Sequence, residues 1–450
     1  MNLKFHFLAF VLFFTSISFS IAQNQAQWNL DTCINYALKH NLNIQKQELT
    51  VSILRNNFDI ARFDRLPSVD ANFTGGTSFG KTFSQDAGEF IDEQVTYLNG
   101  EVSSNVVLFD GFRDASTIKQ RDKEAQAAVY DKEAYANDIA LQIVNYYLQI
   151  LYNREQYNAS LSQLNTTQAQ IERTRKLEQA GSVPKGDVLE LKAQAASEKS
   201  QLVSYLNLEK EARVNLKQAM NIQLDTLIVA GPENIDAEGL YATLKPIDAI
   251  YQTAIGHLPE VKAAKASIMA NEEAINIAKA DYYPSLYLGA SVSTRYNDAA
   301  IDLSDLQDKY TFGEQVQDYL SANVGVTLSI PIFNKFRTKY NVDNAKINLE
   351  IARRDESLTL QNIYKQIESA MNDARAAYEN FQAAKESLSA NKESFKYAEQ
   401  RFNAGLINSV DYNLAKSNLA QAEVEMLNAR YELVFKVKIL DFYMGKELKL

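Results

Sequence analysis

Two aspartates and two histidines stand at matching places in this chain, and their types and spacing suggest different chemistry. Asp187 and Asp411 end the segments AGSVPKGD and AGLINSVD, where a helix is expected to begin. A carboxylate there can cap the helix by accepting a backbone N–H. His40 and His257 each precede a helix break, and a histidine pair binds a metal only with further ligands close by. We therefore expect packing or capping at the histidines and no metal site.

The rest of the composition offers little for catalysis. The 450 residues include one cysteine, Cys33, and three histidines. The sequence has no disulfide framework, nucleophile–histidine–acid set, phosphate-binding loop or cysteine cluster. The net charge of −10 argues against general binding of nucleic acid. We therefore expect a protein that is not an enzyme, binds no cofactor and has no nucleic-acid partner.

The first residues are typical of a signal peptide. Lys4 supplies a positive charge, residues 5–14 form a short apolar run, and Ser20-Ile21-Ala22 fits the small-x-small cleavage rule. We place cleavage after Ala22, so that residues 1–22 are removed. A transmembrane anchor is the alternative, but the apolar run is too short for one. No later stretch of about 20 apolar residues remains, so we expect an exported protein without a membrane-spanning helix.

The chain consists of two copies of one unit. ALKHNLNI at 37–44 aligns with AIGHLPEV at 254–261, an offset of 217 residues, which also brings Pro67-Ser68 onto Pro284-Ser285. Further on the offset is 224, so that Ala180-Gly181 matches Ala404-Gly405. One register held over each segment, with a single jump, indicates a repeat. The ranges are a first repeat at 23–225, a linker at 226–246 and a second repeat at 247–450.

Each repeat combines strands with unusually long helices. Period-two alternation predicts strands over about 67–79, 97–109, 284–296 and 319–331. Helices over about 30–65 and 247–282, each with an early break, should end at the prolines that open the first strand of each repeat. The absence of proline and a coiled-coil spacing predict long helices over about 112–180 and 336–403. Antiparallel helices should return over about 187–219 and 409–443.

The strands have the length and pattern of membrane strands. About 12 residues with one apolar face can cross a bilayer when tilted. Four strands leave unpaired edges that lipid does not tolerate, so copies must pool their strands: two copies give eight, three give twelve and room for a pore. Aromatic residues at the strand ends predict a girdle at the periplasmic interface: Phe109, Tyr282, Tyr283, Phe333 and Phe336. The alternatives are a soluble sheet packed on helices and, for the aromatics, ordinary packing at the junction.

The order and spacing of these motifs resemble the TolC-like outer-membrane efflux family over nearly the whole mature chain. The resemblance is carried by the tandem repeats, by LPS and YPS entering strands, by VVLFDGFR and IPIFNKFR leaving them, and by RFNAGLINSVDYNLAKSNL at the second helical turn. It implies a mainly α fold with a membrane β-barrel. A homotrimer would form a twelve-stranded barrel continued by a periplasmic α-barrel of long antiparallel coiled-coil helices, with the linker in an equatorial belt.

The resemblance also implies partners and site residues. A periplasmic adaptor would dock at the helix tips, which contain Gly181, Val183, Asp187, Gly405 and Ile407, and an inner-membrane RND or ABC transporter would drive export. Asp411 matches an acidic position of the family's periplasmic gate. The next position that is acidic in the family, one helical turn later, is occupied here by Leu414, which carries no charge. The arginine that ties the closed gate in some members is replaced by Ile407. Phe402 would add an apolar constriction. For Asp411, gate lining and capping remain equal alternatives, and for the tips plain turns need the same glycines.

Two functions of different classes fit these features. The first is a passive trimeric duct in the outer membrane of a Gram-negative bacterium, with a periplasmic extension, conducting substrates from adaptor and pump to the exterior. The second is a non-conducting periplasmic coiled-coil scaffold or adhesin. The strands favour the duct, because a scaffold has no need of four amphipathic strands that are long enough to cross a membrane. The pump type and the exported substrate, whether drug, metal or protein, are not encoded in these motifs.

Overall fold

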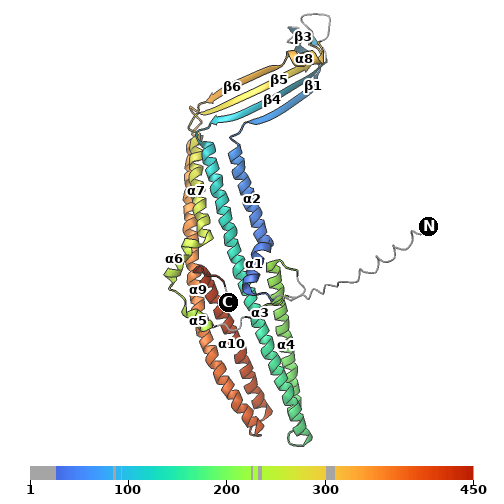
Figure 1. The fold of residues 1–450 in the computed structure, drawn as a ribbon, viewed down its shortest axis with the longest axis vertical. Coiled ribbons are helices and arrows are strands. Elements are labelled where there is room, and N and C mark those ends of the chain that lie inside the picture. Colours follow the sequence, from blue (N-terminus) through green and yellow to red (C-terminus); the bar gives the residue numbers. More distant parts are fainter. Residues whose placement is uncertain are drawn as a thin grey trace, which may run out of the picture.

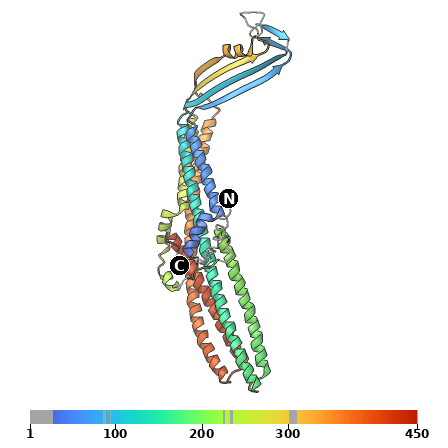
Figure 2. The ribbon, with the colours of Figure 1, turned by 45° about the vertical axis from the view of Figure 1, so that its right-hand side comes forward.

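The computed structural model is an elongated molecule with a sheet at one end and helical hairpins at the other (Figures 1 and 2). It describes residues 27–84, 88–92, 94–223, 227–231, 236–300 and 310–448. The predicted signal peptide, residues 1–22, lies outside the described residues. Long helices connect the two ends, so that any function of the strands is separated from the hairpin tips by nearly the full length of the molecule.

The two repeats contain the same elements in the same order. The first has α1 (Leu30–His40), α2 (Leu42–Phe63), β1 (Ser68–Ser78), β4 (Val95–Phe109), α3 (Arg113–Gln179) and α4 (Lys185–Met220). The second has α6 (Ile247–His257), α7 (Pro259–Ala280), β5 (Ser285–Asn297), β6 (Ser321–Ser329), α9 (Arg337–Asn403) and α10 (Ser409–Tyr443). The long helices α3 and α9 are both 67 residues. Predicted strand and helix positions are thus confirmed to within a few residues.

Three short elements in the loops between strands were not predicted. A hairpin of β2 (Lys81–Ser84) and β3 (Glu89–Asp92) extends the loop between β1 and β4. Helix α8 (Phe312–Asp318) precedes β6 and begins with a capping box formed by Thr311 and Glu314. A further short helix in the linker, α5 (Ala237–Ala242), lies beside α9 and α10.

The main sheet has one apolar and one polar face. Its order is β1-β4-β5-β6, all antiparallel. On one face, Ala71 lies opposite Val102, Val102 opposite Val292, and Val292 opposite Ala322. On the other face the pairs are polar, among them Ser103 with Ser291 and Ser291 with Asn323. Apolar side chains of this sheet are exposed in the single chain, with Phe73 at 75% and Val324 at 76%. The apolar face therefore lacks the cover that a soluble sheet requires.

The strand register repeats with the sequence. Ser68 pairs with Asn105 in the first repeat, and Ser285 pairs with Ser329 in the second. The differences are 285 − 68 = 217 and 329 − 105 = 224, the two offsets of the sequence alignment. The repeat found in the sequence is therefore also a repeat of hydrogen-bonded partners.

Turns at equivalent positions have the same backbone conformation. Phe112 and Phe336 both adopt left-handed φ angles, 67° and 62°, where a strand passes into a long helix. At the far end of those helices, Gly181 and Gly405 have φ of 73° and 70°. There the N–H of Ser182 bonds to the carbonyl of Leu177, and that of Leu406 to Arg401, which closes each helix with a glycine C-cap. The predicted glycine stops are confirmed.

The core lies at mid-height. One buried apolar cluster joins α1, α3, α4, α9 and α10, with Ile143, Ile150, Leu216 and Leu433 fully enclosed. A second joins α6, α7, α9 and α10 around Ile250 and Ile367. Trp28 forms an isolated parallel bridge with Val229 of the linker, which fixes the linker beside the start of the first repeat. Within the described residues, no helix is apolar over a length that could cross a bilayer.

Candidate functional site

The tips of the two helical hairpins are formed by equivalent loops. Gly181 and Gly405 are exposed, while Val183 and Ile407 are half-buried. A Cβ added at either glycine would meet no atom within 4 Å, so the positive φ and not crowding requires glycine there. The loops join α3 to α4 and α9 to α10 at the end farthest from the sheet (Figure 1). They present two matching exposed turns.

The aspartates beyond these turns are not helix caps. Helix α4 begins at Lys185 after Pro184, with no side-chain cap, and Asp187 lies in the first turn. Helix α10 is capped by Asn408, whose side chain accepts the N–H of Asp411 at 2.9 Å. The capping role predicted for Asp187 and considered for Asp411 is therefore wrong. Their carboxylates still favour the positive end of the helix dipole.

The predicted gate residues occupy different environments at the start of α10 and the end of α9. Asp411 is exposed and Leu414 is 61% exposed, one helical turn apart. Phe402 is half-buried and stacks on Tyr412, with ring centroids 4.6 Å apart. Tyr412 is buried, and burial is the main cause that raises its pKa to about 12. Asp411 and Leu414 thus offer side chains to the surroundings, whereas Phe402 packs within its own hairpin.

The predicted aromatic residues gather where strands meet helices. Phe109, Phe333, Phe336, Tyr282 and Tyr283 are between 36% and 72% exposed. Phe333 and Phe336 contact edge to face at 5.5 Å, and Phe109 contacts Phe112 in the same way at 5.3 Å. Phe112 is 67% exposed and was missing from the sequence-based set, although the repeat alignment places it opposite Phe336. Their role as a membrane girdle stays a prediction.

His40, His257 and Cys33 make local contacts within the fold. His257 Nδ1 lies 2.8 Å from the Thr253 carbonyl in its own helix, and the His40 ring packs on Tyr36. In the described part of the chain, no group of three or more His, Cys, Asp or Glu side chains is placed to hold a metal ion. Cys33 is fully buried, and burial raises the pKa of its thiol to about 12.

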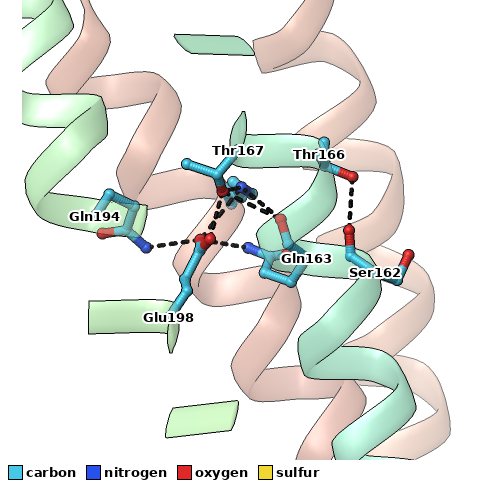
Figure 3. A network of polar contacts seen from close by, with 7 residues as sticks. Ser162, Gln163, Thr166, Thr167, Gln194 and Glu198 are labelled. Atoms are coloured by element: carbon cyan, nitrogen blue, oxygen red, sulfur yellow. Dashed lines mark hydrogen bonds and ion pairs between the residues drawn. The ribbon is translucent and has the colours of Figure 1, made fainter. Parts of the chain in front are cut away.

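A buried polar cluster above the tips was not foreseen from the sequence. Lys416 of α10 has an exposed side-chain fraction of 3% and forms an ion pair with Glu198 of α4, with Nζ and Oε1 3.2 Å apart. The hydroxyl of Thr167 on α3 accepts from Lys416 and donates to Glu198. Gln194 and Gln163 donate to the same carboxylate at 3.0 and 3.4 Å (Figure 3). Burial lowers the pKa of Lys416, and Glu198 partly offsets that effect.

Comparison with known proteins gives this architecture a family. The sequence profile described as outer membrane efflux protein matches residues 33–221 and 250–446, one stretch in each repeat. The probable efflux pump outer membrane protein TtgC of Pseudomonas putida is 21% identical over 89% of this chain and 79% of its own length. Crystal structures of CusC and of VceC from Vibrio cholerae superpose with TM-scores of 0.76 and 0.71. The CusC match covers 95% of this chain and 96% of CusC at 18% identity. The VceC match covers 93% of this chain and 97% of VceC at 17% identity. The chain belongs to the outer membrane efflux protein family.

Proposed function

We propose that this outer-membrane efflux channel works as a passive homotrimeric duct, to which a periplasmic adaptor and an inner-membrane RND or ABC transporter supply substrate and energy. The observation that carries the proposal is the sheet, which has one apolar face, one polar face and two open edges, β1 and β6. Open edges are not stable in lipid, and a closed barrel removes them. The polar face would then line a water-filled lumen.

The repeat indicates how the edges close. Inside one chain, the second strand of the first repeat, β4, pairs with the first strand of the second repeat, β5. The equivalent contact for β6 is β1 of another copy. Shifting the pair Asn105–Gly289 by the two offsets, 105 + 224 and 289 − 217, predicts that Ser329 pairs with Asn72 of the partner subunit. Three copies give twelve strands and room for a pore, in keeping with the family resemblance.

An ion pair at the sheet–helix junction gives this interface a second marker. Arg113 of α3 pairs with Asp281, which follows α7. The same shift predicts that Arg337 pairs with Asp64 of the partner subunit. Arg337 and Asp64 are exposed in the single chain. Both side chains are therefore free to meet a partner subunit.

Cysteine cross-linking tests the trimer. In a Cys33→Ser background, Arg337→Cys with Asp64→Cys should give dimer and trimer bands when a short bifunctional thiol reagent is added to membranes. The matched control is Arg113→Cys with Asp281→Cys, which should cross-link inside one chain without raising the mass. Monomer bands for both pairs would contradict the proposed closure.

Conduction separates the duct from a scaffold or adhesin. The purified protein should run as a heat-sensitive trimer and conduct ions in planar bilayers. A scaffold would pass no current, because it has no continuous lumen. Recovery of the protein as a monomer without detergent would contradict the duct proposal.

At the periplasmic end, we propose that Asp411 and Leu414 face the channel axis as the gate while Phe402 supports α10 through Tyr412. The exposure of the first two side chains and the stacking of the third support this division. Replacing Asp411 with Asn should weaken block by multivalent cations added from the periplasmic side, since an acidic ring would be lost. Asp187→Asn is the matched control. Equal cation block in the unmodified protein, Asp411→Asn and Asp187→Asn would reject a gate role for Asp411. The exposed turns at Gly181 and Gly405 are the proposed docking points for the adaptor.

A further inference from the structure

A cavity lies at mid-height in the first repeat, where the break between α1 and α2 meets α3 and the end of α4 (Figure 1). Its volume of about 520 Å³ is within the range of small-molecule sites. Among the described residues, none of the side chains that line it is charged. Six of them are amides: Asn41, Asn43, Gln142, Asn215, Gln218 and Asn221. The cavity therefore suits an uncharged molecule that can make several hydrogen bonds.

The amides of this cavity fall into two groups. Asn41 and Asn221 donate to backbone carbonyls of neighbouring elements, so their side chains hold the fold. The side chains of Asn43, Asn215 and Gln218 have no hydrogen-bond partner within the described part of the chain. Each of these three offers an acceptor oxygen and two N–H donors. They are therefore available to a bound molecule.

The second repeat shows what fills the equivalent space. The offset of 224 residues takes Gln142 to Gln366 and Ala219 to Tyr443. The ring of Tyr443 is buried in the second apolar cluster, and its hydroxyl donates to Gln366 Oε1 at 3.1 Å. In the first repeat the same glutamine is present, but Ala219 provides neither a ring nor a hydroxyl. What is missing beside Gln142 is thus a ring that carries a hydroxyl.

The walls of the two places also differ in polarity. At the positions of Asn215 and Gln218, the second repeat has Ile439 and Phe442, which pack against the second apolar cluster. The first repeat has thus lost a tyrosine ring and gained amides around the space that the ring would fill. A phenol could satisfy only one of these amides, and a molecule with polar groups around its whole edge could satisfy several.

We propose that this cavity binds an uncharged pyranose sugar with an acetamido group. One sugar hydroxyl donates to Gln142 Oε1, in the place that the hydroxyl of Tyr443 takes in the second repeat. The acetamido group and the other hydroxyls bind the free amides of Asn215 and Gln218. The side chains of Tyr135 and Tyr146 on α3 supply apolar surface for the C–H groups of the ring. The site does not depend on conduction, so its failure and the failure of the duct are measured separately.

The cavity stays open in the proposed trimer. In the second repeat, α3 of the same chain lies beside α7 and α10, and Gln366 is nevertheless exposed. The repeat places α9 of the partner subunit beside α2 and α4 in the same way. Gln142, which is exposed in the single chain, therefore remains within reach of a ligand after the ring closes.

Sugar binding by the purified full-length protein tests the site. Saturation-transfer NMR and calorimetry would use N-acetylglucosamine and tri-N-acetylchitotriose as probes, in a detergent without a sugar headgroup. Saturable binding of both sugars with similar affinity supports a site for free sugar. Binding of the trisaccharide alone supports a site for a glycan strand. Binding of neither sugar overturns the proposal.

The repeat supplies the variants. Ala219→Tyr copies the second repeat and should abolish sugar binding, because its ring fills the cavity while every amide remains. Gln142→Leu should weaken binding about three- to tenfold, since one hydrogen bond is lost. Gln366→Leu is the matched control, and it should leave binding unchanged. If Ala219→Tyr fails to fold, the comparison of Gln142→Leu with Gln366→Leu decides.

Two results would place the sugar elsewhere or remove it. Unchanged affinity in Ala219→Tyr, or equal affinity in Gln142→Leu and Gln366→Leu, would show that sugar does not bind in this cavity. The third probe is p-cresol, a copy of the tyrosine side chain. If p-cresol binds and neither sugar does, the cavity accepts a phenol and the proposal is wrong.

Discussion

The two repeats have nearly the same backbone and different side-chain chemistry at several equivalent positions. Their strands keep one register, and their strand–helix turns share left-handed φ angles. Yet Lys416 is buried whereas the equivalent Lys192 is exposed. At the helix breaks, Asn41 caps α2 through its side chain, whereas Leu258 at the equivalent position before α7 provides no side-chain cap. The comparison teaches that turns and register preserve the shape, while each side chain adapts to what packs against it.

The largest expected difference concerns the lysine pair. Lys416→Ala leaves Glu198 buried without its cation, which should lower the free energy of local opening at the start of α10 by about 3–5 kcal/mol. Lys192→Ala should cost about 0.5 kcal/mol or less, as is usual for an exposed site. Amide hydrogen exchange of residues 409–422 measures both values. Equal protection in the two variants would show that burial does not distinguish the repeats.

The helix breaks should differ by a smaller amount. Asn41 Oδ1 accepts the N–H groups of Asn43 and Ile44, and its Nδ2 donates to the Ala219 carbonyl at 2.8 Å. Replacing it with Ala should cost about 1–2 kcal/mol, because a buried cap is lost.

The second repeat suggests the compensating change. There Pro259 is the first residue of the helix, where a missing N–H needs no cap. Asn41→Leu with Leu42→Pro copies this solution and should recover part of the loss. Hydrogen exchange at residues 43–46 compares the variants, and a double variant weaker than Asn41→Ala would break the equivalence of the two breaks.

The smallest effect is expected at the strand–helix junction. Burial, followed by a hydrogen bond and repulsion from Asp110, raises the pKa of Asp114 to about 6, while the equivalent pair is Asn334 and Thr338. A carboxyl whose pKa is raised on folding binds its proton better in the folded state, so its contribution to stability is lost as pH rises from about 4 to about 6.

Exchanging the two chemistries tests this difference. Asp110→Asn with Asp114→Thr should remove a slight fall in the thermal midpoint between about pH 4 and about pH 6. Asn334→Asp with Thr338→Asp should increase that fall. An unchanged pH profile in both exchanges would mean that the junction carboxylates play no part in it.

Much of this fold could be predicted from the sequence, because each long element has a strong local signal. Pro67 and Pro284 mark the passage from helix to strand, and the alternation after each sets the apolar face. The short elements β2, β3 and α8 were missed because they lie in polar loops, where hydrophobic periodicity is absent. Only the capping box at Thr311 and Glu314 signals α8.

The candidate site was less predictable, because its contacts join distant segments. Asn408 lies three residues before Asp411, and asparagine is a preferred N-cap residue. The sequence could therefore have predicted Asn408, and not the aspartate, as the cap of α10. Lys416 lies on the same helix face as Tyr412, which precedes it by one turn. Its partner Glu198 is 218 residues away, and no nearby sequence feature predicts the pairing. Pairing at such a distance depends on how the hairpins pack.

The pairing of β4 with β5 has a kinetic consequence. A ring of six single repeats would need six bodies to meet, and its rate of assembly would fall steeply with dilution. Covalent linkage through the linker makes every second contact in the proposed trimer intramolecular, at an effective concentration that does not depend on expression level. Only three contacts between chains remain to be made, and two encounters between chains suffice to bring them together. The duplicated chain is therefore expected to close its ring at a lower abundance than two separate half-length chains carrying the same strands.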